Sequence, residues 1–365
     1  MLALGVGTTT AMFSLVNGIL LAPLPYPEPD RLVRLTHTAS SAERATVDLS
    51  DAIVMLYQSA TRAFDGVAAW RFDDGDLGPS EADQTAVRVR GARVTANFFD
   101  VLGVPPARGR AFAPGVDRPG APREVVLSHR IWQERLHGDP DAIGRQIDVN
   151  DVPRTIIGIM PPRFAYPARQ VEIWLPLALD PARTRPATLN LTGIGRLKRG
   201  VSSEAARADL ARVLTNPGES FQGDYFQGGA SAATWRESNI APHVQSLRDS
   251  IVGPPSQLLW FVFGSVLLVL LVACTNVAGL LLVRAERAQM ELAVRAALGS
   301  GFIGVLALTL SESVLLSVLG GGTGVLLAVA SMRVVRSTGT ALSLPRLEDV
   351  GVDAPVLLFA LGITV

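Results

Sequence analysis

The sequence has 365 residues, with 33 basic and 33 acidic side chains, so its formal net charge is zero. Hydrophobic residues make up 48% and charged residues only 18%, below the roughly 25% of an average soluble domain, which favours a membrane protein. A neutral chain offers no positive field for nucleic acid, and a single cysteine, Cys274, excludes both a disulfide framework and a cysteine-based metal site.

The first apolar segment, residues 2–22, is uncharged and barely reaches the roughly 20 residues that cross a bilayer. We predict a first membrane span here, and its shortness indicates that it is truncated. A secretory signal is the alternative, but the segment lacks a basic start and is followed by PLPYPEP instead of a small-residue cleavage site. Gly5 and Gly7 form a lone G-x-G without a preceding strand, which favours helix packing over nucleotide binding.

Residues 23–257 have mixed polarity and contain most of the prolines, which predicts a large α+β domain outside the bilayer, with room for two subdomains. Residues 85–94 and 123–128 have the patterns of strands. Ser128 is placed to cap a helix that ends at Gly138 and carries Ile131, Trp132 and Leu136 on one side.

Two further local signals lie in the same domain. Asn150 and Asp151 predict a hairpin turn between two strands, because both residue types tolerate positive φ. Ser202 is placed to cap a helix whose Ala205, Leu210 and Leu214 fall near one face. The segment 214–235 is rich in Gly, Ser and Gln, which predicts a mobile loop.

Catalytic motifs are weak or missing. Residues 193–200, GIGRLKRG, resemble a phosphate loop but lack its G-K-[ST] ending, so a strand and turn is the better interpretation. The sequence contains no Walker A loop, no G-x-S-x-G elbow and no H-E-x-x-H motif. Four scattered histidines are interpreted as ordinary solvated side chains: His37, His129, His137 and His243. We therefore expect no enzyme activity, no cofactor and no metal site.

Residues 258–283 contain no charge and are long enough for a second membrane span. Asn276 lies within it, and because an unpaired amide is costly in hydrocarbon, we expect this side chain to hydrogen-bond to another helix. A role in moving a substrate is the alternative for the same amide.

Residues 302–335 carry only Glu312 and Arg333, and are too long for one untilted crossing. We predict that Glu312 divides them into an interfacial helix and a third span that begins near Ser313. Gly320 and Gly324 form a G-x-x-x-G motif, which lets two helices approach closely. Residues 336–353 are expected to form a short external loop, and residues 354–365 the start of a truncated fourth span.

Residues 284–301, RAERAQMELAVRAALGSG, form a charged island between the second and third spans. Arg284, Arg287, Glu291 and Arg295 follow helical spacing and make one stripe, and Gly299 is placed to end the helix. Either these charges anchor the chain at the membrane surface, or they form a docking helix for a soluble partner. Arginines lie on both sides of the spans, so charge bias does not decide the orientation.

Several motifs resemble the permeases of MacB/FtsX-type ABC transporters, most closely the first half of the duplicated orphan permeases. The family's Ala-Cys-x-Asn matches residues 273–276, and its Glu-x-x-x-Arg-x-Ala-Leu-Gly matches residues 291–299. The segments VTANFFDVLGVPPARGRAF, VVLSHRIWQERLHGDPDAIGRQIDV and IIGIMPPRFAYP are similar to the MacB-like periplasmic core domain. The sequence departs from the family after Gly299. The family carries a basic residue and a polar amphipathic helix there, whereas Ser300 and Gly301 lead into the apolar segment FIGVLALTL. It departs again at Gly279, which replaces a second amide.

The resemblance implies a multi-pass α-helical protein of the bacterial inner membrane, with the α+β domain outside the cytoplasm and inserted between spans one and two. It implies that residues 284–301 are cytoplasmic and contact a separate ATPase subunit that binds ATP in trans. The implied coupling residues are Arg284, Arg287, Glu291, Arg295, Ala297, Leu298 and Gly299. It also implies pairing with a second FtsX-like half or chain, in contact with membrane lipids.

Three functions stay open at this point, and one of them is a membrane-bound enzyme, which a convergent acid, base or metal cluster in the external domain would support. The first is a noncatalytic permease subunit that couples ATP hydrolysis by its partner to motion of the external domain, for export or extraction of a substrate. The second is an orphan membrane-anchored binding or scaffold protein without an ATPase partner. The sequence does not identify a substrate.

Overall fold

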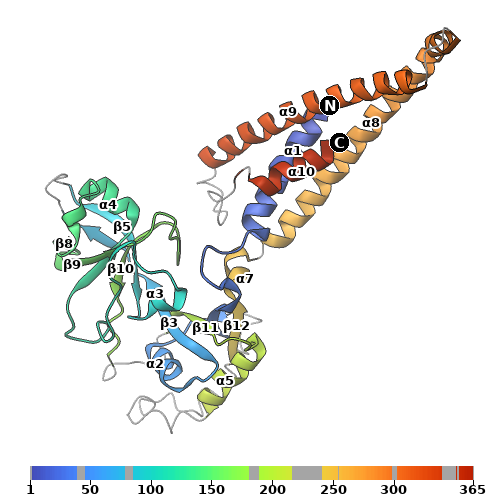
Figure 1. Ribbon diagram of the computed structural model, residues 1–365. Coiled ribbons are helices and arrows are strands. Elements are labelled where there is room, and N and C mark those ends of the chain that lie inside the picture. The colour runs from blue at the N-terminus through green and yellow to red at the C-terminus, as the bar shows by residue number, and fades with distance from the viewer. Residues whose placement is uncertain are drawn as a thin grey trace. The chain divides into compact units, whose positions relative to one another are not determined.

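The protein is described from a computed structural model that covers residues 2–38, 46–78, 85–180, 189–215, 241–253, 255–297, 302–338, 351 and 353–364 (Figure 1). The chain divides into two compact units. A helical unit contains residues 1–23 and 251–365, and an α+β unit contains residues 24–250. The two predicted loops at 214–235 and 336–353 lie almost entirely outside the described residues.

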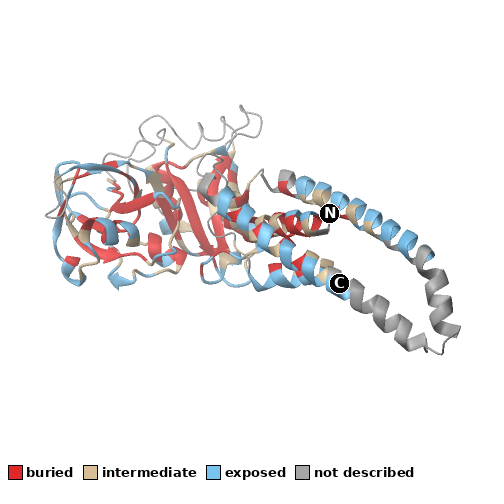
Figure 2. Cartoon of the chain, turned by 90° about the horizontal axis from the view of Figure 1, so that it is seen from above, coloured by how far each residue is buried: buried red, intermediate tan, exposed pale blue. Residues whose placement is uncertain are grey.

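The helical unit is built from four apolar helices. They are α1 (Leu2–Val16), which continues as a π-helical turn (Asn17–Leu21), α8 (Pro255–Ala297), α9 (Phe302–Thr338) and α10 (Ala354–Thr364). In the described part of the chain, three stretches are long and apolar enough to cross a membrane: Ala3–Leu21, Leu259–Arg284 and Ser317–Val334. Large apolar side chains are exposed along α8 and α9, in contrast to the buried interior of the sheet (Figure 2).

Residues 302–335 lie within one helix, because α9 runs through Glu312 from Phe302 to Thr338. The division into an interfacial helix and a third span stays a prediction, and the apolar stretch of α9 that is long enough to cross a membrane is Ser317–Val334. Glutamate is a good helix former, so a single charged residue in an apolar sequence does not break the backbone hydrogen bonds of the helix. Similarly, α8 does not stop at the end of the second apolar segment but continues through the charged island to Ala297.

The α+β unit is organised on one twelve-stranded sheet that carries two hydrophobic cores. Its strands are β1 (Leu32–Thr38), β2 (Thr46–Val47), β3 (Phe64–Phe72), β4 (Gly75–Leu77), β5 (Val87–Val94), β6 (Arg108–Gly109), β7 (Glu124–Leu127), β8 (Gln146–Val149), β9 (Val152–Ile159), β10 (Val171–Pro176), β11 (Thr192–Leu197) and β12 (Ala241–Ser246). The prediction of an α+β domain is correct, and the two subdomains take the form of two cores along one sheet.

Six strands form a closed ring. Their order is β10–β7–β9–β8–β4–β5, and β10 also pairs with β5 in parallel, which closes the circle. The ring encloses a core that includes Val125, Ile147, Ile156 and Leu175. Helix α4 (His129–Leu136) belongs to the same part of the unit. Closure removes the free edges that an open sheet would present.

The other core lies on the antiparallel strands β3, β11 and β1, which are continued by β12. Helices α2 (Asp51–Ala60) and α5 (Ser203–Thr215) contribute to this core, which contains Leu35, Tyr57 and Leu210. The buried face of α5 differs from the prediction, since Ala206 and Val213 are buried while Ala205 is exposed. Residues 206, 210 and 213 are spaced by four and three, which places them on one side of a helix.

The predicted caps and turns are confirmed. The hydroxyl of Ser128 accepts a hydrogen bond from the backbone N–H of Ile131 at 3.1 Å, and Ser202 accepts one from Ala205 at 3.2 Å. Asn150 and Asp151 have φ values of 53° and 58° and join β8 to β9. Residues 193–200 form strand β11 and the turn after it, as interpreted from the missing G-K-[ST] ending.

Candidate functional site

The charged island forms the last part of α8. Residues 284–297 are helical, and the side chain of Arg284 is exposed. The side chains of Arg287, Glu291, Arg295 and Ala297, together with all of Leu298 and Gly299, lie outside the described part of the chain. The charged stripe and the helix end at Gly299 therefore stay predictions. What the structure adds is the continuity of the backbone from the apolar segment into the island.

Helix α1 packs closely on both α8 and α9. A Cβ atom built on Gly7 would lie 2.9 Å from the carbonyl oxygen of Gly324, and one built on Gly324 would lie 3.0 Å from Cβ of Val6. A Cβ on Gly5 would lie 3.1 Å from the side chain of Leu270 in α8. Because real Cβ contacts are longer, these glycines allow the helix backbones to approach in a way that a side chain would prevent.

The other two predicted packing residues occupy different positions. Gly320 is partly buried, whereas its neighbour Gly321 is buried against Thr364 of α10. Asn276 is exposed on α8, where few residues of the apolar segment are buried within the chain. The expected hydrogen bond from Asn276 to another helix stays a prediction. Because Asn276 is exposed on α8, its partner would belong to another half or chain.

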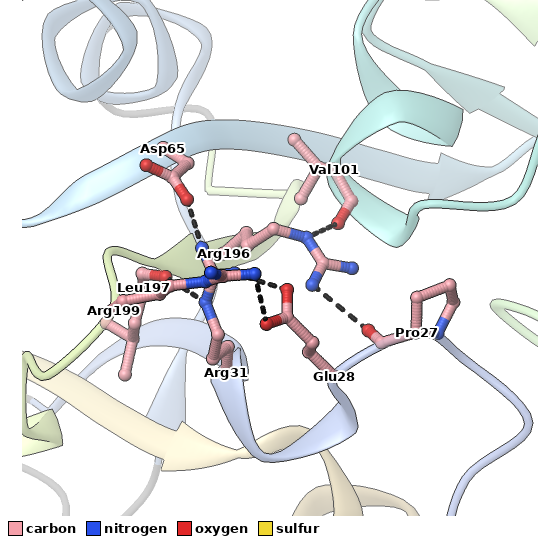
Figure 3. A network of polar contacts seen from close by, with 8 residues as sticks. All are labelled: Pro27, Glu28, Arg31, Asp65, Val101, Arg196, Leu197 and Arg199. Atoms are coloured by element: carbon pink, nitrogen blue, oxygen red, sulfur yellow. Dashed lines mark hydrogen bonds and ion pairs between the residues drawn. The ribbon is translucent and has the colours of Figure 1, made fainter.

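A polar network holds the segment that follows the first apolar helix (Figure 3). We call it the junction network and define it as Glu28, Arg31, Asp65, Arg196 and Arg199. Arg31 forms ion pairs with Glu28 and with Asp65 of β3, and its Nε donates to the carbonyl oxygen of Leu197 at 2.7 Å. Arg199 adds a second ion pair to Glu28 at 3.0 Å. The network ties the first residues of the α+β unit to β3 and β11.

Arg196 is the buried member of the junction network. Its Nε donates to the carbonyl oxygen of Val101 at 2.8 Å, and its Nη1 donates to that of Pro27 at 3.0 Å. Burial lowers the pKa of Arg196, the charge of Arg31 lowers it further, and Glu28 and Asp65 oppose this change. Burial raises the pKa of Glu28, but the charges of Arg199 and Arg31 have the larger combined effect, so the pKa of Glu28 is lowered.

A polar hollow of about 320 Å³ lies beside this network. Its lining includes Asp65, Asn97, Asp100 and Asp117, with Phe112 among the apolar members. Asp117 accepts a hydrogen bond from the backbone N–H of Ala96 at 2.9 Å, so this carboxylate has a structural role. Within the described residues, no three His, Cys, Asp or Glu side chains come together in an arrangement that could hold a metal ion.

The interpretation of the histidines as solvated is wrong for one of the four. His37 on β1 is fully buried, and its Nε2 lies 2.8 Å from the hydroxyl of Tyr57 on α2. Burial lowers the pKa of His37 to about 4 and raises the pKa of Tyr57 well above its usual range. The sequence signal was the apolar neighbourhood of His37 in LVRLTHT, which alternation along a strand could have placed inside.

The fold defines a class of protein, an α+β domain joined to apolar helices, three of which are long enough to span a membrane. Residues 1–213 match the MacB-like periplasmic core domain, and because this match covers more than half of the sequence, the chain belongs to that family. The family supports an extracytoplasmic position of the α+β unit and a relation to the MacB permeases of ABC transporters.

Individual relatives are distant. The macrolide export ATP-binding/permease protein MacB of Chromobacterium violaceum is 27% identical over 68% of this chain and 37% of its own length. MacB of Escherichia coli K12 is 24% identical over 65% of this chain and 34% of its own length. This chain therefore spans about a third of the curated relatives it matches. The crystal structure of the periplasmic region of MacB from Actinobacillus actinomycetemcomitans is similar with a TM-score of 0.42 and 13% identity, over 66% of this chain and 95% of that one.

Proposed function

We propose that this protein is a noncatalytic permease subunit of a MacB/FtsX-type ABC transporter in the bacterial inner membrane. A separate ATPase binds ATP in trans, contacts the charged island, and drives motion of the α+β unit for export or extraction of a substrate. The relatives named above are ATP-binding/permease proteins, which supports a role for this chain beside an ATPase. In this proposal the partner hydrolyses ATP.

The observation that carries the proposal is the continuity of α8. This helix has 43 residues and passes from the apolar segment Leu259–Arg284 into the charged island without a break. At a rise of 1.5 Å per residue, about 13 residues of helix extend some 20 Å beyond the apolar segment. A continuous helix transmits displacement along its axis, so a push on the island would move the whole span.

Two features of the chain suit the remaining parts of this mechanism. The glycine contacts of α1 with α9 and its packing on α8 let the helices move as a group. The junction network joins the segment after α1 to β3 and β11, so that displacement of α1 would reach the sheet through Arg31 and Arg196. The exposed Asn276 suits pairing of α8 with a second FtsX-like half or chain, because a paired amide is far less costly in a membrane.

The test is copurification of the full-length protein from its native membranes in mild detergent. We expect an ABC ATPase to accompany the parent protein and to be lost from the double variant Glu291→Arg, Arg295→Glu. Arg333→Glu in α9 serves as a matched control, since it changes an exposed charge outside the island. Absence of the ATPase from the parent at normal expression would contradict the proposal and leave a membrane-anchored scaffold as the function.

A further inference from the structure

Two arginines point into the six-strand ring. Arg154 pairs with Ile147 across β8 and β9, and Arg93 pairs with Leu175 across β5 and β10. Ile147 and Leu175 both belong to the core that the ring encloses. Directly paired residues in a sheet share a face, so Arg93 and Arg154 lie on the inner face of the ring.

A third arginine lies at the same end of the ring. The backbone N–H of Thr155 donates to the carbonyl oxygen of Arg123 at 2.8 Å, which extends the β7–β9 ladder by one residue before Glu124. Strand β7 is parallel to β9, and both are antiparallel to β10 and β5, so the starts of β7 and β9 meet the ends of β10 and β5. We call Arg93, Arg123 and Arg154 the arginine cluster.

The arginine cluster has too few acidic partners among the described residues. Nε of Arg93 donates to Asp73 at 2.6 Å. Among the groups in the described part of the chain, Asp73 is also the one carboxylate whose charge acts on Arg154. Nε of Arg154 is buried and has no hydrogen-bond acceptor within the described part of the chain. Three guanidinium groups against one carboxylate leave a surplus of two positive charges.

Neighbouring charges do not remove this surplus. Arg71 of β3 pairs with Arg93 across the sheet. The charge of Arg71 acts on the carboxylate of Asp51, so Arg71 and Asp51 together carry no net charge. Burial lowers the pKa of Arg154, and the charges of Arg93 and Arg123 lower it further, while Asp73 opposes them. Like charges held together at a half-buried position are costly unless an anion accompanies them. Arg123 is exposed, so such an anion could enter from solvent.

We propose that the arginine cluster binds a phosphate group at the end of the ring where its three arginines lie. A phosphate monoester carries about −1.5 to −2 charges at neutral pH and three acceptor oxygens, which matches the surplus of two positive charges. Guanidinium groups bind such oxygens through paired N–H donors, and the buried Nε of Arg154 supplies a donor that lacks an acceptor. A soluble phosphate compound and a lipid headgroup share this chemistry. The proposal is independent of the ATPase partner.

The experiment is equilibrium dialysis of radiolabelled inorganic phosphate against the full-length protein in a nonionic detergent, at constant ionic strength set with chloride. The variants are Arg154→Gln and Arg123→Gln, with Arg88→Gln as the control. Arg88 lies on the same strand as Arg93 but is exposed, and its neighbour Val89 belongs to the core, so Arg88 faces outward. Circular dichroism identifies any variant that fails to fold, and the exposed position of Arg123 keeps the test valid if Arg154→Gln is such a variant.

We expect one phosphate per parent chain, binding weakened about tenfold or more in Arg154→Gln and Arg123→Gln, and binding within about twofold of the parent in Arg88→Gln. Unsaturable binding to the parent, or equal losses in all three variants, would overturn the proposal. Nanodiscs with and without phosphatidic acid then separate the two sources. If phosphatidic acid displaces labelled phosphate, the natural ligand of the arginine cluster is a lipid headgroup. If binding of labelled phosphate is unchanged, the natural ligand is a soluble phosphate compound. Both results uphold the site.

Discussion

The buried pair of His37 and Tyr57 makes the stability of the α+β unit sensitive to acid. Burial holds the pKa of His37 at about 4 in the folded protein, against an ordinary value of 6.5. Above the ordinary pKa neither state binds the proton, so the histidine has no effect on stability there. Below it the unfolded chain binds a proton that the folded chain excludes, and stability falls until the pH reaches the folded pKa.

The size of the effect follows from the two pKa values. A difference of about 2.5 units corresponds to roughly 3 kcal/mol in full, at 1.36 kcal/mol per unit. Acidification from about pH 7 to about pH 5 should realise about 2 kcal/mol of this loss. We expect His37→Gln, which retains a hydrogen-bonding group near Tyr57 but does not titrate, to remove that part of the pH dependence.

The measurement is urea unfolding of the full-length protein in detergent, followed by tryptophan fluorescence across this pH range. His137→Asn is the matched control, because His137 is exposed and its φ of 50° is tolerated by asparagine. We expect the control to retain the pH dependence of the parent. Equal losses of stability in the parent and in His37→Gln would refute the reasoning, since the buried histidine would then have no part in the acid sensitivity.

Three other substitutions test contacts described above. Gly324→Leu should destabilise the helical unit by about 1–3 kcal/mol, because a Cβ at this position already meets α1. Gly322→Leu is the control, since a Cβ there has open space. Thermal unfolding followed by circular dichroism should show a lower midpoint for Gly324→Leu than for Gly322→Leu. Arg196→Met should lower the urea midpoint, at a cost of roughly 2 kcal/mol, since the buried carbonyl of Val101 and the part-buried carbonyl of Pro27 lose a charged donor. An unchanged midpoint would exclude a stabilising role for the junction network. Burial raises the pKa of Asp209, but hydrogen bonds from Arg212 and two backbone N–H groups lower it overall. Asp209→Ala should therefore cost about 1–2 kcal/mol of stability at neutral pH, and little once acid protonates the carboxylate. A stability difference that persists in acid would contradict this.

Short-range signals predicted the local structure well. Ser128 and Ser202 cap their helices, and Asn150 with Asp151 forms the hairpin turn, because each depends on backbone groups only a few residues away. Signals that needed a partner surface were less reliable. Periodicity alone placed Ala205 in the core, whereas the sheet that α5 packs against buries Ala206.

The candidate sites divide in the same way. The charged island and its adjoining span were visible as sequence, and a resemblance to known permeases supplied their predicted role. The junction network was missed, because Arg31 and Leu197 are 166 positions apart and meet only when β1 and β11 pair. The arginine cluster was missed for a similar reason, since its members lie on β5, on β9 and just before β7, in a ring whose closure no local pattern encodes.

The amino-acid sequence by itself determined the apolar helices, the α+β character of the domain, the caps and turns, and the absence of a Walker A loop. These properties depend on hydropathy and on backbone preferences that act within one helical turn or one strand. The tertiary structure decided that α9 is unbroken at Glu312, that His37 is buried and that three arginines come together at one end of the ring. Such outcomes depend on which surfaces pack together, and that is settled by the free energy of the whole fold.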